Sequence, residues 1–99
     1  MSEYYFSEKA VADLNDIWIY TAEHWSIEQA NRYYNLIVDE IENIVENLET
    51  AKDFGTIRKN YKYSKVKSHL VFFKIDNDNK IEIVRILHEK IEIANKFIT

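Results

Sequence analysis

The sequence predicts an α+β domain in which a helical hairpin packs on an antiparallel sheet, with the element order β-α-α-β-β-β. Three observations lead to this prediction. Apolar residues recur at helical spacing in two adjacent segments, strand-like segments follow after residue 60, and short turns separate those strands. Helices that precede a run of strands are typical of α+β folds. We expect residues 1–99 to form one domain, because a chain of this length supplies one hydrophobic core.

The first elements are a short aromatic strand and a helix. Residues 3–6 form the predicted strand, and Ser7 is the expected N-cap of a helix that runs to about Glu23. Phe6 precedes the cap and is expected to pack on Val11 one turn later. The apolar stripe of this helix consists of Ala10, Val11, Leu14, Ile17, Trp18 and Thr21.

A second helix follows after about three residues. Ser26 and Gln29 have the spacing of a capping box, in which each side chain satisfies an unpaired backbone N–H group. The following apolar residues alternate in steps of three and four, the clearest periodic signal in the chain: Ile27, Ala30, Tyr34, Ile37, Ile41, Ile44 and Leu48. Because the connection is short, we expect the two helices to form an antiparallel hairpin.

Three strands are predicted in the second half of the chain. They comprise residues 61–66, 69–75 and 81–88, with turns at Lys67-Ser68 and at residues 76–79. Short turns connect neighbouring antiparallel strands, so these three strands should form a meander. Residues 91–98 are expected to form a short C-terminal helix.

The strand at residues 81–88 is apolar on both faces but contains Arg85 and His88. Strict alternation places Ile81, Ile83, Arg85 and Leu87 on one face and Glu82, Val84, Ile86 and His88 on the other. A strand that is apolar on both sides is expected inside the sheet, covered on both faces. Its two polar side chains then need a partner within the fold or access from outside.

The composition excludes several classes of site. The chain has no cysteine and one glycine, so disulfides, thiolate chemistry and glycine-rich phosphate loops are excluded. The three histidines lie on separate elements without zinc-ligand spacing. We therefore expect no metal and no cofactor. The N-terminus lacks the features of a signal peptide, and no apolar run is long enough to span a membrane, so we expect a cytoplasmic protein without a membrane partner.

Charge is distributed unevenly along the chain. Residues 1–53 carry a balance of −9, whereas residues 56–74 contain six basic residues and no acidic residue. This basic strip consists of Arg58, Lys59, Lys62, Lys65, Lys67 and Lys74. It either meets an anionic partner or forms a solvated face of the sheet.

One set of residues has the chemistry of a metal-independent ribonuclease. Arginine and lysine bind phosphate, and histidine exchanges protons near neutral pH. If the protein cleaves RNA, Arg58, Arg85 and His88 are its predicted catalytic residues. The structural alternatives are an ion pair between Arg85 and a helix carboxylate, and a hydrogen-bonded strand-end histidine at position 88.

The aromatic residues of the hairpin are expected mainly in the core: Trp18, Trp25, Tyr33 and Tyr34. Those of the strands can leave an aromatic surface on the sheet: Tyr4, Tyr5, Tyr61 and Tyr63. In so small a domain an exposed aromatic groove indicates a protein partner more often than a cofactor.

The ordered set of local sequences resembles the RelE/ParE superfamily of toxin–antitoxin toxins, and the local matches favour the ParE branch. The resemblance covers nearly the whole chain. The segments that carry it are residues 6–14, 17–21, 25–26, 29–30, 33–34, 54–55 and 58, followed by Ser68-His69-Leu70-Val71-Phe72-Phe73-Lys74-Ile75 and Ile83-Val84-Arg85-Ile86-Leu87-His88.

The resemblance implies a toxin that is neutralised by a cognate ParD-like antitoxin in a hetero-oligomer. ParE-like toxins are associated with DNA gyrase, whereas RelE-like toxins cleave mRNA on the ribosome with basic residues and a C-terminal Arg and Tyr. Residues 89–99 contain neither Arg nor Tyr, and the acidic total does not suit ribosome binding.

The leading hypothesis is therefore gyrase inhibition by protein–protein interaction, without catalytic residues and without sequence-specific DNA binding. The alternatives are a RelE-like mRNA endonuclease and a non-toxic member that only binds an antitoxin. The residues expected to bind a partner are Trp18, Trp25, Tyr34, Arg58, Tyr61, Lys62, Tyr63, Lys67, His69 and Arg85.

Overall fold

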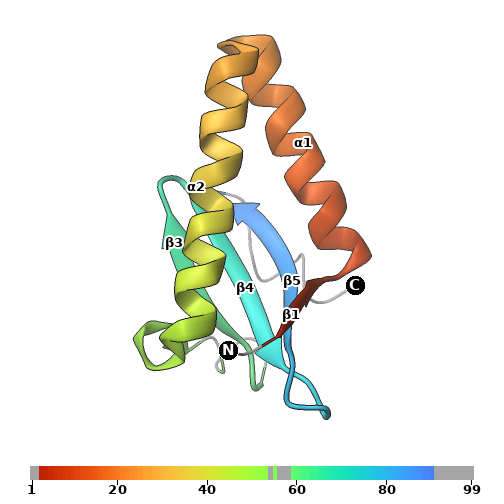
Figure 1. Cartoon of the computed structure of the whole chain (residues 1–99), viewed down its shortest axis with the longest axis vertical. Coiled ribbons are helices and arrows are strands. Elements are labelled where there is room, and N and C mark those ends of the chain that lie inside the picture. The colour runs from red at the N-terminus through yellow and green to blue at the C-terminus, as the bar shows by residue number, and fades with distance from the viewer. Residues whose placement is uncertain (1–2, 54, 56–58, 91–99) are drawn as a thin grey trace.

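Two helices and five strands make up the fold, and the computed structural model describes them over residues 3–53, 55 and 59–90. The helices are α1 (Glu8–His24) and α2 (Ile27–Glu46), followed by a single 3-10 turn at Leu48–Thr50. The strands are β1 (Tyr4–Phe6), β2 (Lys52–Asp53), β3 (Lys62–Val66), β4 (His69–Ile75) and β5 (Ile81–His88) (Figure 1). The predicted α+β class and element order are confirmed, with β2 as an additional short strand.

The strands form one sheet in the order β1-β5-β4-β3-β2. The predicted antiparallel meander of β3, β4 and β5 is confirmed. However, β1 pairs in parallel with β5, which makes the sheet mixed and places β4 at its centre. β5 is predicted to lie inside the sheet. It lies between two strands only at Ile81–Ile83, where β1 pairs with it. The predicted C-terminal helix lies outside the described residues.

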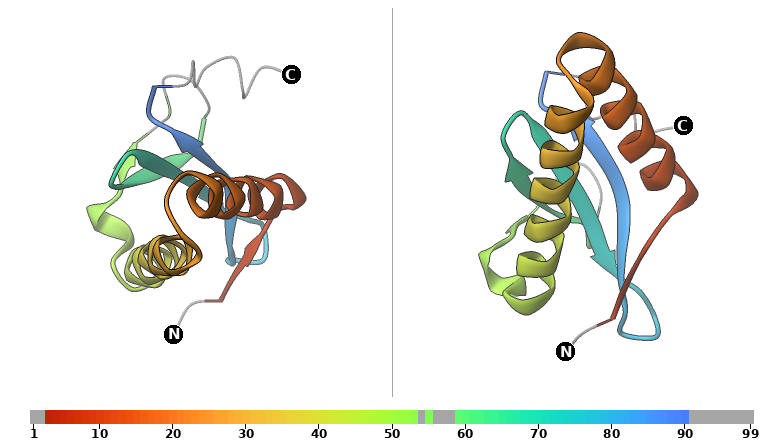
Figure 2. Two further views of the ribbon diagram at one scale, coloured as in Figure 1. Left: turned by 90° about the horizontal axis from the view of Figure 1, so that it is seen from above. Right: turned by 45° about the horizontal axis from the view of Figure 1, so that its top comes forward.

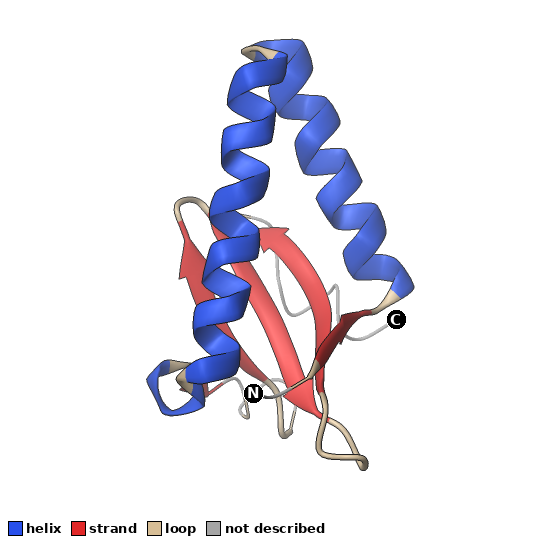
Figure 3. Ribbon diagram, viewed as in Figure 1, coloured by secondary structure: helices blue, strands red, loops and turns tan. Residues whose placement is uncertain are grey.

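The helical hairpin covers one face of the sheet, as Figures 2 and 3 show. Each helix begins at a serine whose side-chain oxygen accepts a backbone N–H: Ser7 from Ala10 and Ser26 from Gln29, both at 3.0 Å. These are the two N-caps that the sequence predicts. The buried side of α2 supplies Ile37, Ile41 and Ile44, which pack against β-strand residues in the main core. Neither helix is long and apolar enough to cross a membrane within the part of the chain that the structure describes.

A β-bulge changes which face the residues of β5 occupy. The register shifts between Phe72 and Phe73 of β4, which pair with Arg85 and Ile83, so Val84 is the extra residue. Val84 lies on the predicted face, opposite Ile81 and Ile83, but the strict alternation expected for β5 is wrong beyond it. Ile86 joins Ile81 and Ile83 in the core beneath the helices, whereas Leu87 packs with Phe72 and Tyr61 on the opposite face. Both faces of the sheet are thus apolar, as expected.

Candidate functional site

Arg85 is tied to the first helix by a two-point ion pair. Its Nε donates to Oδ2 of Asp13 at 2.8 Å, and its Nη2 donates to Oδ1 at 2.9 Å. The two side chains are only 14% and 12% exposed. This contact is the structural alternative foreseen for Arg85, an ion pair with a helix carboxylate. The carboxylate of Asp13 neutralises the charge of this guanidinium, which weakens its attraction for phosphate.

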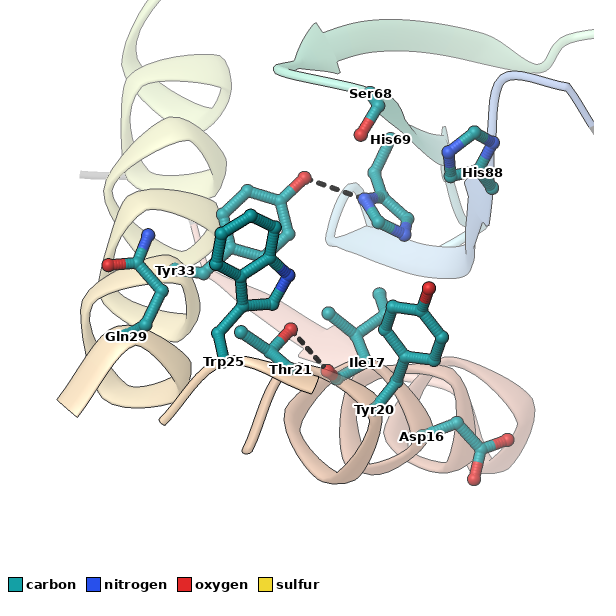
Figure 4. A pocket seen from close by; sticks show the side chains of 10 residues that line it. All are labelled: Asp16, Ile17, Tyr20, Thr21, Trp25, Gln29, Tyr33, Ser68, His69 and His88. Atoms are coloured by element: carbon teal, nitrogen blue, oxygen red, sulfur yellow. Dashed lines mark hydrogen bonds between the residues drawn. The ribbon is translucent and has the colours of Figure 1, made fainter. Parts of the chain in front are cut away.

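An open pocket lies between the tip of the hairpin and the adjoining ends of β4 and β5. Its volume is about 550 Å³, and half of the residues that line it have aromatic rings. Figure 4 shows how side chains from α1, α2 and the two strands converge there. We call this site the aromatic pocket; it is lined by Asp16, Ile17, Tyr20, Thr21, Trp25, Gln29, Tyr33, Ser68, His69 and His88.

His69 is held in the neutral state at the back of the aromatic pocket. Its Nδ1 lies 2.6 Å from the hydroxyl of Tyr33, which also donates to the carbonyl of Val66 at 3.3 Å. Its ring meets that of His88 edge to face, with 5.2 Å between centroids. Burial, followed by repulsion from His88, lowers the pKa of His69 from 6.5 to about 4. At neutral pH His69 is therefore an uncharged hydrogen-bonding group.

A second pocket of about 490 Å³ lies at the other end of β4 and is basic. Lys59, Lys62 and Lys74 line it together with Asp53 and Tyr61. The ammonium group of Lys74 lies 5.6 Å from the centre of the Tyr61 ring and 3.6 Å from a carboxylate oxygen of Glu82. We call this site the basic pocket. It gathers three lysines of the strip that the sequence marks as a possible anion-binding region.

The structure divides the predicted site residues among several places. Trp25, His69 and His88 meet in the aromatic pocket, and Tyr61 and Lys62 meet in the basic pocket. The remaining predicted residues are separate from both: Trp18, Tyr34, Tyr63, Lys67 and Arg85. Arg58 lies outside the described residues. The set predicted for ribonuclease chemistry is thus not assembled within the described structure, since His88 lies in the aromatic pocket and Arg85 is bound to Asp13.

The core assignment of the hairpin aromatics is wrong for two of four residues. Trp25 is 77% exposed and Tyr34 is 42% exposed. Trp18 is half-buried and its indole N–H donates to Oδ1 of Asn31 at 2.9 Å, and Tyr33 packs against the core. Trp25 ends α1 just past its last turn, so it lies off the stripe that faces the sheet.

Sequence reasoning missed the α1 side of the aromatic pocket. Asp16 and Tyr20 are four residues apart and therefore share a face of the helix. Tyr20 is 60% exposed. The ring of His24 stacks on one side of the Tyr20 ring, with 4.0 Å between the two ring centroids. A signal was present: Tyr20 is a large aromatic side chain that falls outside the predicted buried stripe.

Comparison with known proteins identifies the family. Toxin ParE1 of Caulobacter vibrioides is 35% identical over 89 residues, which is 90% of this chain and 91% of the relative. Toxin ParE1 of Mycobacterium tuberculosis is 28% identical over 92 residues, or 93% and 94% of the two chains. A solved structure described as the chromosomal ParDE TA system from P. aeruginosa has the same fold, with a TM-score of 0.77, 18% identity, and coverage of 89% of this chain and 96% of that one. The family model described as "ParE toxin of type II toxin-antitoxin system, parDE" matches residues 4–93, and the chain belongs to this family.

Proposed function

We propose that this ParE-family toxin acts in the cytoplasm by binding DNA gyrase and that it carries out no catalytic step of its own. The choice of gyrase follows the family resemblance. The observation that supports a non-catalytic mode is the Arg85–Asp13 ion pair, which uses the guanidinium that a ribonuclease would need for phosphate. A neutral, partly buried His69 likewise contributes no positive charge to a phosphate site at neutral pH.

The proposed partner that neutralises the toxin is a cognate antitoxin with an acidic and apolar segment. Exposed aliphatic side chains near the hairpin tip supply a surface for its apolar residues: Ile19 and Ile27. The basic pocket supplies charge complementarity for its acidic residues through Lys59, Lys62 and Lys74. The two surfaces together support a segment that extends across the hairpin and the sheet.

A supercoiling assay with purified toxin and purified gyrase tests the target. We expect supercoiling to fall as the toxin concentration rises through the micromolar range, and mRNA to remain intact on ribosomes in a parallel primer-extension assay. Ribosome-dependent cleavage by a toxin that leaves gyrase undisturbed would favour the endonuclease instead. Growth without arrest on expression, together with normal gyrase activity, would favour a non-toxic family member.

Co-expression with the product of the neighbouring short open reading frame tests the antitoxin. We expect the two proteins to co-purify and growth to be restored. The double variant Lys59→Glu/Lys62→Glu should weaken the complex about tenfold or more, because it reverses two charges in the basic pocket. The matched control is Lys9→Glu, which reverses an exposed charge on α1 outside both pockets. Equal weakening by both changes would argue against the basic pocket as the acidic segment's contact.

A further inference from the structure

The aromatic pocket is rich in aromatic rings, and neither lysine nor arginine is among the described residues that line it. Five rings contribute to it, from Tyr20, Trp25, Tyr33, His69 and His88. In the described part of the chain, the carboxylate that lines it is that of Asp16, at the rim beside Tyr20 (Figure 4). Aromatic faces carry the negative part of the ring quadrupole, so such a lining attracts cations. The aromatic pocket and the basic pocket thus have opposite electrostatic character.

Tyr33 positions His69 at the back of the aromatic pocket. Its hydroxyl lies 2.6 Å from Nδ1 of His69 and 3.3 Å from the carbonyl oxygen of Val66. Figure 4 shows the second ring nitrogen of His69 pointing away from Tyr33. The imidazole ring is therefore held in place as part of the aromatic lining.

A planar cation matches these features. Guanidinium stacks on aromatic rings and pairs with carboxylates, whereas the ammonium of lysine lacks a flat face. Trp25 is 77% exposed and Tyr20 is 60% exposed, so ring surface is accessible at the rim. His24 covers one face of Tyr20, which leaves the other face for stacking.

We propose that the aromatic pocket binds an arginine side chain of the partner segment, with the guanidinium stacked on Tyr20 and Trp25 and paired with Asp16. The assignment of this arginine to the antitoxin rests on the proposed function. The affinity of the pocket for guanidinium is independent of the proposed function. His69 begins β4 and Ile75 ends it, and these residues line the aromatic and the basic pocket respectively. The arginine therefore binds about 20 Å from the acidic residues of the same segment, a separation that fixes the direction of binding.

Nuclear magnetic resonance with small probes tests the proposal without any partner. The probes are Nα-acetyl-arginine methylamide and its citrulline counterpart, which has a similar shape but no charge. We expect the arginine probe to shift the indole N–H of Trp25 and the ring signals of His69 in a saturable way. The indole of Trp18, hydrogen-bonded to Asn31 outside the pocket, should not respond. The citrulline probe should bind at least about fivefold more weakly, the ratio expected for one favourable cationic contact.

Variants separate the contributions within the pocket. Trp25→Ala should abolish the arginine response seen at His69, and Asp16→Asn should weaken binding about threefold to fivefold. Val11→Ala removes an exposed apolar side chain of α1 that does not line the pocket, so it should bind as the parent does. Both pocket residues are exposed, so the folded spectrum should persist in each variant.

Three results would overturn the proposal. Equal binding of the arginine and citrulline probes would show that charge is not recognised, and tighter binding of a leucine counterpart would show that the pocket accepts an apolar anchor. The same holds if a well-dispersed spectrum shows no saturable shift of Trp25 at tens of millimolar arginine probe. Because no antitoxin and no gyrase are present, these results leave the proposed toxin function untouched. Conversely, a toxin without effect on gyrase would still be expected to bind the arginine probe.

Discussion

Asp13 and Arg85 are joined by two parallel hydrogen bonds although 72 positions separate them in the chain. The same carboxylate also accepts the backbone N–H of Ile86 at 3.0 Å, so Asp13 binds both a side chain and the main chain of β5. The pair connects α1 to β5 just beyond the bulge at Val84. It therefore fixes the position of the first helix on the sheet.

The first prediction concerns this pair. Asp13→Ala should lower the free energy of unfolding by about 3 kcal/mol, because it leaves a mostly buried guanidinium and a backbone N–H without an acceptor. Asp13→Asn should cost less, about 2 kcal/mol, because its amide oxygen still accepts one of these hydrogen bonds. Urea unfolding followed by circular dichroism measures both. Asp16→Asn is the control, with an expected change within about 0.5 kcal/mol. A cost below 1 kcal/mol for Asp13→Ala would contradict the role given to the pair.

The second prediction compares the two N-cap serines. Both accept a backbone N–H at 3.0 Å, but only Ser7 also donates its hydroxyl to a strand, at 2.7 Å from the carbonyl of Val84. Ser26→Ala should therefore cost about 1 kcal/mol and Ser7→Ala about 2 kcal/mol in unfolding free energy. Urea titrations of the two variants under one condition provide the comparison. Equal costs would mean that the hydroxyl contact with β5 adds no stability.

The third prediction concerns the turn between β3 and β4. Lys67 has a φ of 56°, in the left-handed region that residues other than Gly and Asn rarely adopt. Lys67→Asn should stabilise the protein by about 0.5–1 kcal/mol, because Asn tolerates this conformation. Lys67→Val should destabilise it by about 1–2 kcal/mol, because a β-branched residue is strained there. Thermal unfolding should shift in opposite directions for the two variants; a shift in the same direction would contradict the assigned cause.

The fourth prediction concerns acid stability. The folded-state pKa of His69, about 4, lies below its ordinary value of 6.5, so between these values the unfolded chain binds the additional proton. The stability linked to neutral His69 is therefore complete above pH 6.5 and is lost as the pH falls towards 4. Since solvent reaches part of the ring, we expect a loss of about 1–2 kcal/mol.

Urea titrations from pH 7 to pH 4 measure this loss, compared between the parent and His69→Gln. The variant should show a flatter dependence of unfolding free energy on pH. His24→Gln is the control, because His24 is exposed at the end of α1 and does not line the aromatic pocket. An unchanged dependence in His69→Gln would assign the acid sensitivity to other groups.

Local chemistry made most of the fold predictable. The two serine caps, the periodic apolar residues of α2 and the polar turn at residues 76–79 each act within a few positions of the chain. The bulge at Val84 and the parallel pairing of β1 depend on distant contacts, and neither has a local sequence signal. For the same reason, alternation assigned Ile86 and Leu87 to the wrong faces.

The candidate site was predictable only in part. His69, His88 and Trp25 stood out by residue type, but nothing in the sequence indicated that they share one pocket. Asp16 and Tyr20 were missed because an exposed helix face resembles any solvated surface until the strands beside it are placed. Trp25 was assigned to the core because hydrophobic character alone does not show where a helix ends.

The bond network at the start of α1 also bears on association between copies of the chain. Beyond Phe6, β1 no longer pairs with β5, and the backbone groups of Val84 and Ile86 would form an open strand edge. The hydroxyl of Ser7 and the carboxylate of Asp13 occupy the carbonyl of Val84 and the N–H of Ile86. An open edge is where a second molecule can add a strand and start an aggregate. Ser7 and Asp13 thus leave neither of these two backbone groups free to pair with a strand of another molecule.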